Sequence, residues 1–379
     1  MSETQQPERP HLHRSSRDPE QLGGSLEQWL ATQLPDAAAP RLTALQSTSD
    51  NGMSSDTVLF DAAWEEGAET HAERLVARIA PSPGDVPVFP SYDLRRQFET
   101  IRLVGELTTV PVPRVWWFEP DPAIVGSEFF VMSRVDGDVP PDVMPYDFGD
   151  NWLFDAPAAA QRRLQDSTVG VLAELHAIEE PEPRFGYLAH DTPGADALRR
   201  HVAHTRQWYE FAAADGGRSP LLDRGFAWLD DHWPRQPGPT VLSWGDARIG
   251  NVLYRDFEPV AVLDWEMAGL GPPELDVAWL INAHRTFEDL AAEYGLPGMP
   301  DFLRADDVCA TYEAGTGYAP RNLAFYGTYA ALQWGVVFLR TGRRQIHFGE
   351  REAPADPTEL LHNRRSIERM LAGEYWADS

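Results

Sequence analysis

The sequence predicts a two-lobed α+β fold, with a small β-rich N-terminal lobe that contains one helix and a larger, mainly helical C-terminal lobe. At 379 residues, the chain exceeds what one compact hydrophobic core usually holds. Short strand-like runs prevail up to about residue 135, and stretches with helical periodicity prevail beyond it. We therefore expect a disordered tail over residues 1–24, a small N-terminal lobe over 25–135 and a larger helical C-terminal lobe over 136–379.

The composition narrows the possible classes of function. The chain has 32 basic and 59 acidic residues, and its net charge of -27 repels nucleic-acid phosphates and anionic lipid headgroups, since the basic residues form no cluster along the chain. Cys309 is the only cysteine, which excludes an intrachain disulfide and fits a reducing compartment. No apolar run approaches about 18 residues, and the start of the chain lacks a secretory signal. We expect a cytoplasmic protein without nucleic-acid or membrane partners.

The N-terminal lobe is predicted to begin with a helix and to continue as a meander of strands. Residues 25–28 have the arrangement of a capping box, and Leu26, Trp29 and Leu30 follow at helical spacing. The runs RLTALQS, TVLFDAAW and RLVARIA, between residues 41 and 80, predict three strands. The other expected elements are a helix over 92–104 and strands over 114–118 and 128–132.

The C-terminal lobe is predicted to consist mostly of helices. The clearest covers residues 158–178, where Leu164, Val171 and Leu175 lie on one apolar stripe and Asp155 is placed to cap the first turn. Further helices are expected over residues 197–213, 221–233, 273–286, 305–314, 323–340 and 357–371.

One stretch of the C-terminal lobe has strand character and carries polar residues at the strand ends. Two apolar runs, over residues 241–254 and 260–266, are joined by a short return that brings Asp246, Asn251 and Asp264 together. Two carboxylates and an amide oxygen are hard donors of the kind that Mg²⁺ accepts alongside phosphate oxygens and water. Each residue alone is better explained as a turn or strand-end cap, but their joint occurrence predicts a phosphoryl-transfer site, which needs a hydroxyl-orienting group and a metal.

This stretch resembles the aminoglycoside phosphotransferase and choline kinase-like families, whose catalytic loop has the pattern H-G-D-x-x-x-x-N. Trp244-Gly245-Asp246 through Asn251 matches that pattern except at its first residue, where Trp244 replaces the histidine that mainly braces the loop. The resemblance covers about residues 42–339 and implies a protein kinase-like fold. It implies Asp246 and Arg248 as catalytic residues, and Asn251 and Asp264 as metal ligands.

Two further residues are expected to support this loop rather than to react. Asp276 lies in GLGPPELDVAW, which is similar to the family's G-x-P-x-x-D-L-A helix start, and the resemblance implies that it caps that helix and braces the loop. His176 ends the long helix over 158–178, and a packed, hydrogen-bonded histidine is the expected role. Side chains proposed for the substrate wall, each of which is also a candidate for the core, are Trp208, Tyr209, Trp279 and Trp334.

The resemblance also assigns nucleotide contacts in the N-terminal lobe. The loop DNGMSSD between the first two strands is similar to the family's phosphate-covering loop, which makes Gly52, Ser54 and Ser55 cofactor-binding candidates. Arg78 occupies the place of the kinase strand lysine, and an arginine can grip two phosphate oxygens, although an outward-facing strand arginine is the competing interpretation. On the following helix Gln97 stands where a glutamate is common.

The strand run FFVMS and the residues after it resemble the family's hinge, where main-chain groups bind an adenine ring. Ser133 and Val135 are the positions that present those groups. The whole pattern implies an ATP- and Mg²⁺-dependent enzyme that phosphorylates a hydroxyl of a small-molecule substrate.

Alternatives to an aminoglycoside kinase remain open. The nearest branch of the resemblance is that of phosphotransferase domains fused to acyl-CoA dehydrogenases, which points to hydroxyacyl-CoA acceptors. A nucleotide-binding pseudokinase without turnover is a second alternative, because Trp244, Arg78 and Gln97 depart from the usual residues. A protein kinase is disfavoured by the lack of the H-R-D, D-F-G and A-P-E motifs.

Overall fold

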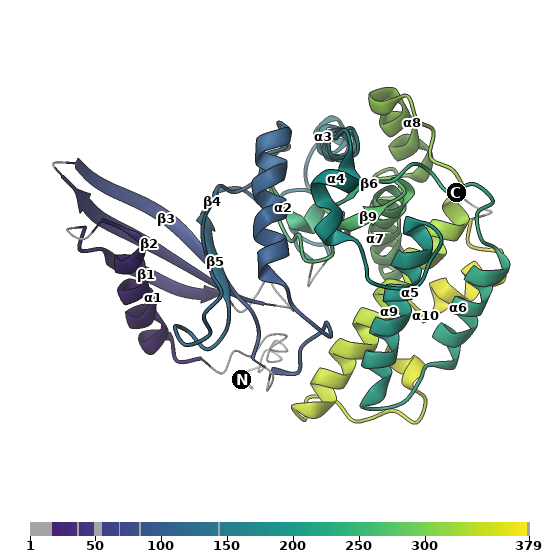
Figure 1. Ribbon diagram of the computed structural model, residues 1–379. Coiled ribbons are helices and arrows are strands. Elements are labelled where there is room, and N and C mark those ends of the chain that lie inside the picture. Colours follow the sequence, from purple (N-terminus) through teal and green to yellow (C-terminus); the bar gives the residue numbers. More distant parts are fainter. Residues whose placement is uncertain are drawn as a thin grey trace, which may run out of the picture. The chain divides into compact units, whose positions relative to one another are not determined.

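The computed structural model describes residues 17–35, 38–48, 55–67, 69–82, 85–142 and 145–376. The chain forms two compact units, which are discontinuous in sequence. The first unit comprises Met1–Arg95, Val115–Arg134 and Thr341–Ala353, and the second comprises Arg96–Arg114, Val135–Arg340 and Pro354–Ser379. The predicted α+β class is confirmed, since the first unit is built on an antiparallel sheet and the second is mainly helical (Figure 1).

The first unit contains a five-stranded antiparallel sheet in the order β1-β2-β3-β5-β4. The strands are β1 (Arg41–Thr48), β2 (Asp56–Glu66), β3 (Glu69–Ile79), β4 (Val115–Glu119) and β5 (Phe129–Ser133). Along β2, buried and less buried residues alternate in its first half, so that one face packs in the core and the other does not. The five strands expected from the sequence are therefore present.

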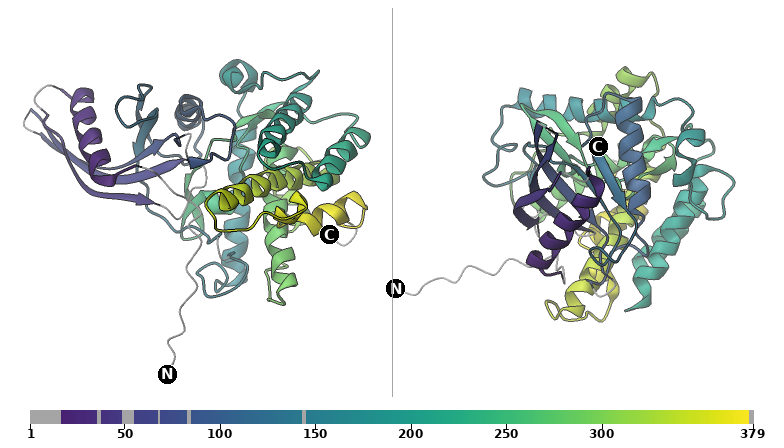
Figure 2. Two further views of the ribbon diagram at one scale, coloured as in Figure 1. Left: turned by 90° about the horizontal axis from the view of Figure 1, so that it is seen from below. Right: turned by 60° about the vertical axis from the view of Figure 1, so that its left-hand side comes forward.

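Helix α1 (Pro19–Gln33) packs its apolar side against this sheet (Figures 1 and 2). Leu26, Trp29 and Leu30 lie in one hydrophobic cluster with the buried residues of β2 and β3. The indole N–H of Trp29 also donates a hydrogen bond of 2.8 Å to Glu119. Burial of the Trp29 ring, rather than helix propensity alone, holds α1 in place.

The capping box predicted at residues 25–28 is wrong, because α1 begins earlier. The Asp18 carboxylate accepts a hydrogen bond of 3.2 Å from the Gln21 N–H, and the Asp18 carbonyl accepts one of 3.0 Å from Leu22. Asp18 is thus the residue that satisfies the first turn, and residues 19–24, predicted as tail, are helical. The rest of the predicted tail, residues 1–16, lies outside the described residues.

The second unit is formed mainly by helices (Figure 2). They are α2 (Leu94–Leu107, from Arg96 on), α3 (Ala158–His176), α4 (Pro181–Phe185), α5 (Ala197–Ala214), α6 (Pro220–Asp231), α7 (Glu274–Glu293), α8 (Ala305–Thr316), α9 (Leu323–His347, as far as Arg340) and α10 (Arg364–Leu371). They match those predicted except that α4 was not expected and that the helix expected over 357–371 is divided into the 3₁₀ helix η4 (Pro357–Leu360) and α10. The predicted cap of α3 is wrong: Pro157 precedes its first turn and Asp155 makes no capping hydrogen bond there. No helix among the described residues is long and apolar enough to cross a membrane.

Two short antiparallel strand pairs interrupt the helices and carry the predicted loop. Strand β6 (Val241–Ser243) pairs with β9 (Gly269–Gly271), and β7 (Val252–Arg255) pairs with β8 (Glu258–Val262), both antiparallel. The loop between β6 and β7 contains the one-turn 3₁₀ helix η3 (Ile249–Asn251). The loop from β8 to β9 contains Asp264, so the two pairs hold both predicted parts of the site.

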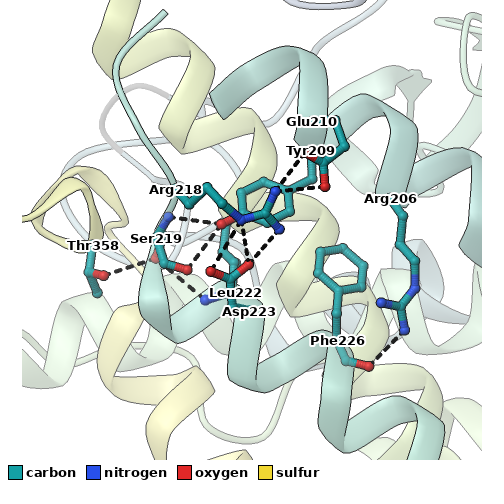
Figure 3. Close-up of polar contacts among 9 residues, drawn as sticks. All are labelled: Arg206, Tyr209, Glu210, Arg218, Ser219, Leu222, Asp223, Phe226 and Thr358. Carbon is teal, nitrogen blue, oxygen red and sulfur yellow. Dashed lines mark hydrogen bonds and ion pairs between the residues drawn. The ribbon is translucent and has the colours of Figure 1, made fainter. Parts of the chain in front are cut away.

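A polar cluster fixes α5 to α6 (Figure 3). Arg218 forms ion pairs with Glu210 on α5 and Asp223 on α6, each at 2.6 Å, and its guanidinium lies 4.7 Å above the Tyr209 ring. The Tyr209 hydroxyl donates to the Ser219 carbonyl at 3.0 Å, and the Ser219 side chain caps α6. Tyr209 is therefore a core residue here rather than part of a substrate wall.

Candidate active site

The predicted catalytic loop leaves β6 through a turn that only glycine can make without strain. Gly245 has φ +91°, and a Cβ atom added to it would lie 2.1 Å from the carbonyl oxygen of Met267. The loop backbone therefore passes directly against the segment that follows Asp264. This close approach explains the glycine in the Trp-Gly-Asp sequence.

The carboxylate of Asp276 braces the start of this loop, as predicted, but it does not cap α7, whose N-cap is Pro273 without a side-chain capping bond. It accepts hydrogen bonds from the Ser243 hydroxyl at 2.8 Å, the Trp244 N–H at 2.8 Å and the Gly245 N–H at 2.9 Å. Burial alone would raise its pKa, but hydrogen bonds from His176, Gly245 and Ser243 hold the pKa below its usual range. A buried carboxylate that is charged and fully bonded makes the loop rigid.

His176 is packed and hydrogen-bonded, as predicted, and supports Asp276 from behind. Its Nε2 lies 2.9 Å from the Asp276 carboxylate and its Nδ1 lies 2.7 Å from the Tyr312 hydroxyl. All three side chains are buried. Because both ring nitrogens are engaged, this histidine orients the aspartate and has no atom left for the reaction.

Trp244 braces the loop at the position where the family pattern has histidine. Its ring is fully buried, and its indole N–H donates a hydrogen bond of 2.9 Å to the carbonyl of Leu263. The Leu263 N–H in turn donates to the Asn251 carbonyl at 2.9 Å. Leu263 is therefore held from both sides, which fixes the residue immediately before Asp264.

Asp246 lies among hydrogen-bond donors from its own loop and from α7. The Trp279 indole N–H donates to its Oδ1 at 2.8 Å, and the Asn251 amide donates to its Oδ2 at 2.6 Å. Arg248 Nε lies 3.2 Å and 3.1 Å from the two oxygens. Such a carboxylate is held in one orientation, which a residue that positions a hydroxyl group requires.

Arg248 connects Asp246 to a second acid that the sequence pattern does not identify. The guanidinium forms an ion pair with Asp142, and a Cβ atom on Gly250 would lie 2.5 Å from the Asp142 carboxylate oxygens. Burial alone would lower the Arg248 pKa, but Asp142 and Asp246 raise it above its usual range. Arg248 therefore carries its positive charge at neutral pH and shares it between two carboxylates.

The chemistry of Asn251 and Asp264 fits the Mg²⁺ site expected from the sequence. The Asn251 side-chain nitrogen donates to Asp246, and its Oδ1 makes no hydrogen bond to a described residue. Asp264 has φ +59°, a left-handed conformation that aspartate adopts more readily than most residues, and it is half-buried. One carboxylate and one amide oxygen suit an ion that takes its other ligands from phosphate and water. No cluster of three or more His, Cys, Asp or Glu side chains in the described ranges could hold a metal by itself.

Trp279 and its neighbours form an aromatic surface beside Asp246. The Trp279 ring lies 6.1 Å from the Trp334 ring, which lies 6.0 Å from Phe287 and 5.6 Å from Phe338. Trp279 is buried, whereas the other three rings are half-buried. Two of the proposed wall residues, Trp279 and Trp334, are thus placed near Asp246. Trp208 is buried on α5.

The nucleotide-binding candidates of the first unit are only partly described. Gly52 and Ser54 lie outside the described residues. Ser55 is buried just before β2, and its hydroxyl has no hydrogen-bond partner among the described residues. Arg78 lies on β3 opposite Thr57 and donates to the Thr57 hydroxyl at 3.2 Å. The guanidinium of Arg78 thus lies next to the strand that follows the predicted phosphate loop.

The predicted hinge residues lie at and just after the end of β5. The Ser133 side chain accepts a hydrogen bond of 2.9 Å from the Trp116 indole, and Val135 follows outside any helix or strand. Ser133 belongs to the first unit and Val135 to the second. Gln97 is buried on α2, in the second unit.

Residues 50–305 match the model of a family described as the phosphotransferase enzyme family. Among curated proteins, mouse acyl-CoA dehydrogenase family member 10 is 26% identical over 243 residues, covering 61% of this chain and 21% of the relative. Human acyl-CoA dehydrogenase family member 11 is 25% identical over 257 residues, covering 67% of this chain and 30% of the relative. The chain thus spans at most about a third of the length of these relatives.

Solved structures show the same fold. A Ralstonia eutropha protein assigned as an aminoglycoside phosphotransferase superposes with a TM-score of 0.63 at 20% identity, covering 93% of this chain and 97% of the other. The macrolide 2'-phosphotransferase MphH of Brachybacterium faecium gives 0.52 at 19%, covering 90% and 97%. The aminoglycoside phosphotransferase APH(4)-Ia, in a complex with AMP-PNP and hygromycin B, gives 0.53 at 16%, covering 92% and 99%. The two-lobed, kinase-like fold predicted from the sequence is confirmed.

Proposed function

Since the chain belongs to the phosphotransferase enzyme family, we propose that it transfers the γ-phosphoryl group of ATP to a hydroxyl group of a small molecule. One observation carries the assignment of the site: Asp246 and Asn251 are hydrogen-bonded to each other on one rigid loop, and Leu263 ties Asp264 to that loop. A hydroxyl-orienting carboxylate next to a pair of hard oxygen donors is what phosphoryl transfer requires.

Asp246 is the residue that orients the acceptor hydroxyl and takes up its proton. Its bonds to Trp279, Asn251 and Arg248 keep the carboxylate fixed, so that little reorganisation is needed when the hydroxyl approaches. Phosphoryl transfer proceeds through a loose transition state, in which positioning matters more than the strength of the base. Arg248 supplies a fixed positive charge beside the reacting oxygens.

Asn251 and Asp264 are the proposed ligands of Mg²⁺, through Asn251 Oδ1 and the Asp264 carboxylate. When bound, this ion neutralises negative charge between the β- and γ-phosphates. Trp244 contributes indirectly, because its bond to the Leu263 carbonyl sets the direction in which Asp264 leaves the strand. The bracing role given to histidine in the family pattern is thus available to an indole.

The first unit supplies the proposed nucleotide contacts. Gly52, Ser54 and Ser55 cover the phosphates, and Arg78 binds their oxygens. Support for this comes from the buried, unbonded hydroxyl of Ser55 at the start of β2 and from Arg78 on the adjacent strand β3. Main-chain groups at Ser133 and Val135 bind the adenine ring. The neighbour APH(4)-Ia was solved with the ATP analogue AMP-PNP, which favours ATP as the donor.

Two classes of acceptor are supported by different observations. The structural neighbours are named for aminoglycoside and macrolide substrates, and the negative net charge of -27 suits a polycationic aminoglycoside. The curated relatives are named as acyl-CoA dehydrogenase family members, and the half-buried rings of Trp334, Phe287 and Phe338 suit an apolar acyl chain, which favours a hydroxyacyl-CoA. A pseudokinase is disfavoured, because Asp246, Asn251 and Asp264 are all retained.

The test is detection by mass spectrometry of a product heavier by one phosphoryl group after incubation with ATP and Mg²⁺. Aminoglycosides, amino alcohols, sugars and hydroxyacyl-CoA compounds are offered in separate arms. Asp246→Asn should abolish the product while nucleotide binding is kept, whereas Asp264→Asn should weaken Mg²⁺-dependent nucleotide binding. Full activity in both variants would show that the site has been assigned wrongly.

A further inference from the structure

Three histidines gather in the second unit beside β9. His190 follows the 3₁₀ helix η2 (Gly186–Leu188), and His201 and His204 lie on α5. The rings of His190 and His204 are stacked, with centroids 4.0 Å apart and an angle of 12° between their planes. The His201 ring meets His190 edge-on at 5.2 Å.

Most of the hydrogen-bonding capacity of these rings is unused. His201 is buried and its Nδ1 lies 2.6 Å from the Tyr329 hydroxyl. His190 and His204 are half-buried, and neither ring makes a hydrogen bond to a residue that the structure describes. Two half-buried imidazoles thus keep ring nitrogens that no described residue engages. Within the described ranges these histidines do not form a three-ligand metal site.

Two arginines add positive charge near these rings. Arg200 lies one helical turn before His204 on α5, so the two side chains share one face of the helix. Repulsion from Arg96, on the first turn of α2, lowers the pKa of His190 and of His204, and repulsion from Arg200 lowers the pKa of His190. The Arg200 guanidinium makes one long hydrogen bond of 3.4 Å, to the Gly194 carbonyl, and no ion pair with a described residue. We call these five residues, His190, His201, His204, Arg96 and Arg200, the histidine–arginine cluster.

The charge balance of the cluster is opposite to that of the whole chain, whose net charge is -27. Burial, and then repulsion from His201, His204, Arg96 and Arg200, holds the His190 pKa far below its usual range. Burial and Arg96 lower the His204 pKa, while burial and His204 lower that of His201, which Asp276 opposes. The neutral form of the three rings is therefore favoured, first by burial and then by the neighbouring positive charges.

We propose that the histidine–arginine cluster binds the phosphate group of a small-molecule anion. A phosphate dianion would pair with the forked guanidinium groups of Arg96 and Arg200 and accept hydrogen bonds from the imidazole edges. Its charge would reverse the local repulsion, so that the rings take up protons and become stronger donors. A carboxylate carries only one negative charge and would leave most of the positive charge of the two arginines and the protonated rings uncompensated.

The cluster also lies close to the catalytic loop along the fold. His190 Nε2 lies 3.7 Å from the place where a Cβ atom on Gly269 would sit, and Gly269 pairs with Ser243, two residues before Gly245. A phosphate held here would anchor the rest of a molecule on the catalytic unit. The idea that this phosphate belongs to the molecule whose hydroxyl accepts the phosphoryl group rests on the proposed function. Phosphate binding by the cluster does not.

The experiment titrates the full chain, without ATP or Mg²⁺, while histidine side-chain resonances are followed by NMR at pH 7. Inorganic phosphate, glucose 6-phosphate, coenzyme A and acetate are the separate probes. We expect saturable shifts of the His190 and His204 signals toward the protonated form with the phosphate probes and not with acetate. Calorimetry in buffers of different ionisation enthalpy should show uptake of about one proton per bound phosphate.

Arg200→Gln should weaken phosphate binding by about 10-fold, since it removes a charged hydrogen bond. Arg199→Gln is the matched control, because Arg199 is exposed and lies over the Trp233 ring. This variant should bind phosphate as tightly as the parent protein. His190→Gln keeps a hydrogen-bonding side chain that cannot take up a proton, so binding should persist while proton uptake falls. Thermal melting of each variant verifies that it is folded.

The outcomes separate the sources of the phosphate. Tighter binding of glucose 6-phosphate or coenzyme A than of inorganic phosphate would assign a phosphorylated organic molecule, and the reverse order would assign free phosphate. Absence of saturation with every phosphate probe, or equal weakening by Arg199→Gln and Arg200→Gln, would overturn the proposal. Neither result depends on whether the kinase assay succeeds.

Discussion

The indole N–H of Trp279 donates a hydrogen bond of 2.8 Å to Oδ1 of Asp246. Trp279 lies on α7, which also carries Asp276 at its first turn, so one helix both braces the catalytic loop and orients its carboxylate. The proposed hydroxyl-orienting residue is thus positioned from outside its own loop.

Trp279→Phe should lower kcat by about 10-fold with little effect on the KM for ATP, because it removes one charged hydrogen bond and keeps most of the ring volume. Steady-state kinetics measures both parameters. Trp334→Phe is the control, since that neighbouring ring donates no hydrogen bond to Asp246 in the structure. Equal losses in the two variants would mean that ring packing, rather than the bond to Asp246, matters.

Trp244→Phe should raise the Mg²⁺ concentration needed for half-maximal nucleotide binding, because the Leu263 carbonyl loses the bond that fixes Asp264. A several-fold shift is expected from the loss of one buried hydrogen bond. Trp265→Phe is the matched control: its indole is also buried and donates to the Val262 carbonyl at 3.1 Å. Nucleotide binding at increasing Mg²⁺ measures the effect, and an unchanged midpoint for Trp244→Phe would contradict it.

Gly245→Ala should abolish transfer, because its Cβ atom would collide with the Met267 carbonyl and its φ is positive. The loop must shift, which moves Asp246 out of place. Gly170→Ala on α3 is the control, since nothing lies within 4 Å of its Cβ position and alanine favours a helix. Product formation is compared for the two variants after circular dichroism has shown both to be folded. A fully active Gly245→Ala enzyme would exclude this account of the turn.

Asp147 should make stability depend on pH. The side chain is fully buried, and neither carboxyl oxygen has a hydrogen-bond partner among the described residues. Burial, and then repulsion from Glu288, raises the pKa of Asp147 to about 7. The folded state therefore keeps a proton that the unfolded chain releases near pH 4. The stability that this retained proton gives the folded state is lost as pH rises from about 4 to 7, so the free energy of unfolding falls over that range.

Asp147→Asn should consequently be more stable than the parent at pH 8, on the order of 1 to 3 kcal/mol, with the difference disappearing near pH 4. Melting curves across this pH range measure it. Asp301→Asn changes an exposed carboxylate and should leave the profile unchanged. A parallel pH profile for Asp147→Asn and the parent would show that the carboxyl group is ionised in the folded protein.

Ser219→Ala should destabilise the contact between α5 and α6 by about 1 kcal/mol, since it removes the N-cap of α6. It also removes a hydrogen bond of 2.9 Å to Thr358 (Figure 3). Chemical denaturation measures the change, with Ser91→Ala at an exposed position as the control. Catalytic parameters at low temperature should stay as in the parent, because neither bond touches the catalytic loop.

The sequence predicts the elements and the catalytic loop well, because both depend on local patterns. Asp246 and Asn251 lie five residues apart in one loop, and this short separation already predicts that their side chains lie close together. Trp279 was expected only as a wall or core residue, and Asp142 was not expected at the site at all. Their contacts join segments that are 33 and 106 residues away from the loop, and no local periodicity encodes such pairings.

Two errors in the sequence analysis have the same local origin. The capping box at residues 25–28 satisfies the pattern, yet Asp18 is available earlier and starts α1 there. Asp155 likewise fits a cap for the helix predicted over 158–178, yet Pro157 holds the N-cap position of α3 and no side chain caps that helix. In both cases the local pattern alone does not fix where the helix begins.

The bonds around Asp276 have a consequence for how the enzyme becomes active as it folds. Asp276 lies 33 residues from Ser243 and 100 residues from His176, so the loop is braced only after distant segments have docked. Closing such long loops lowers the entropy of the chain before the contacts with Asp276 can form. These contacts are therefore expected to form late in folding. During refolding from denaturant, helical circular dichroism should therefore recover first and enzymatic turnover last.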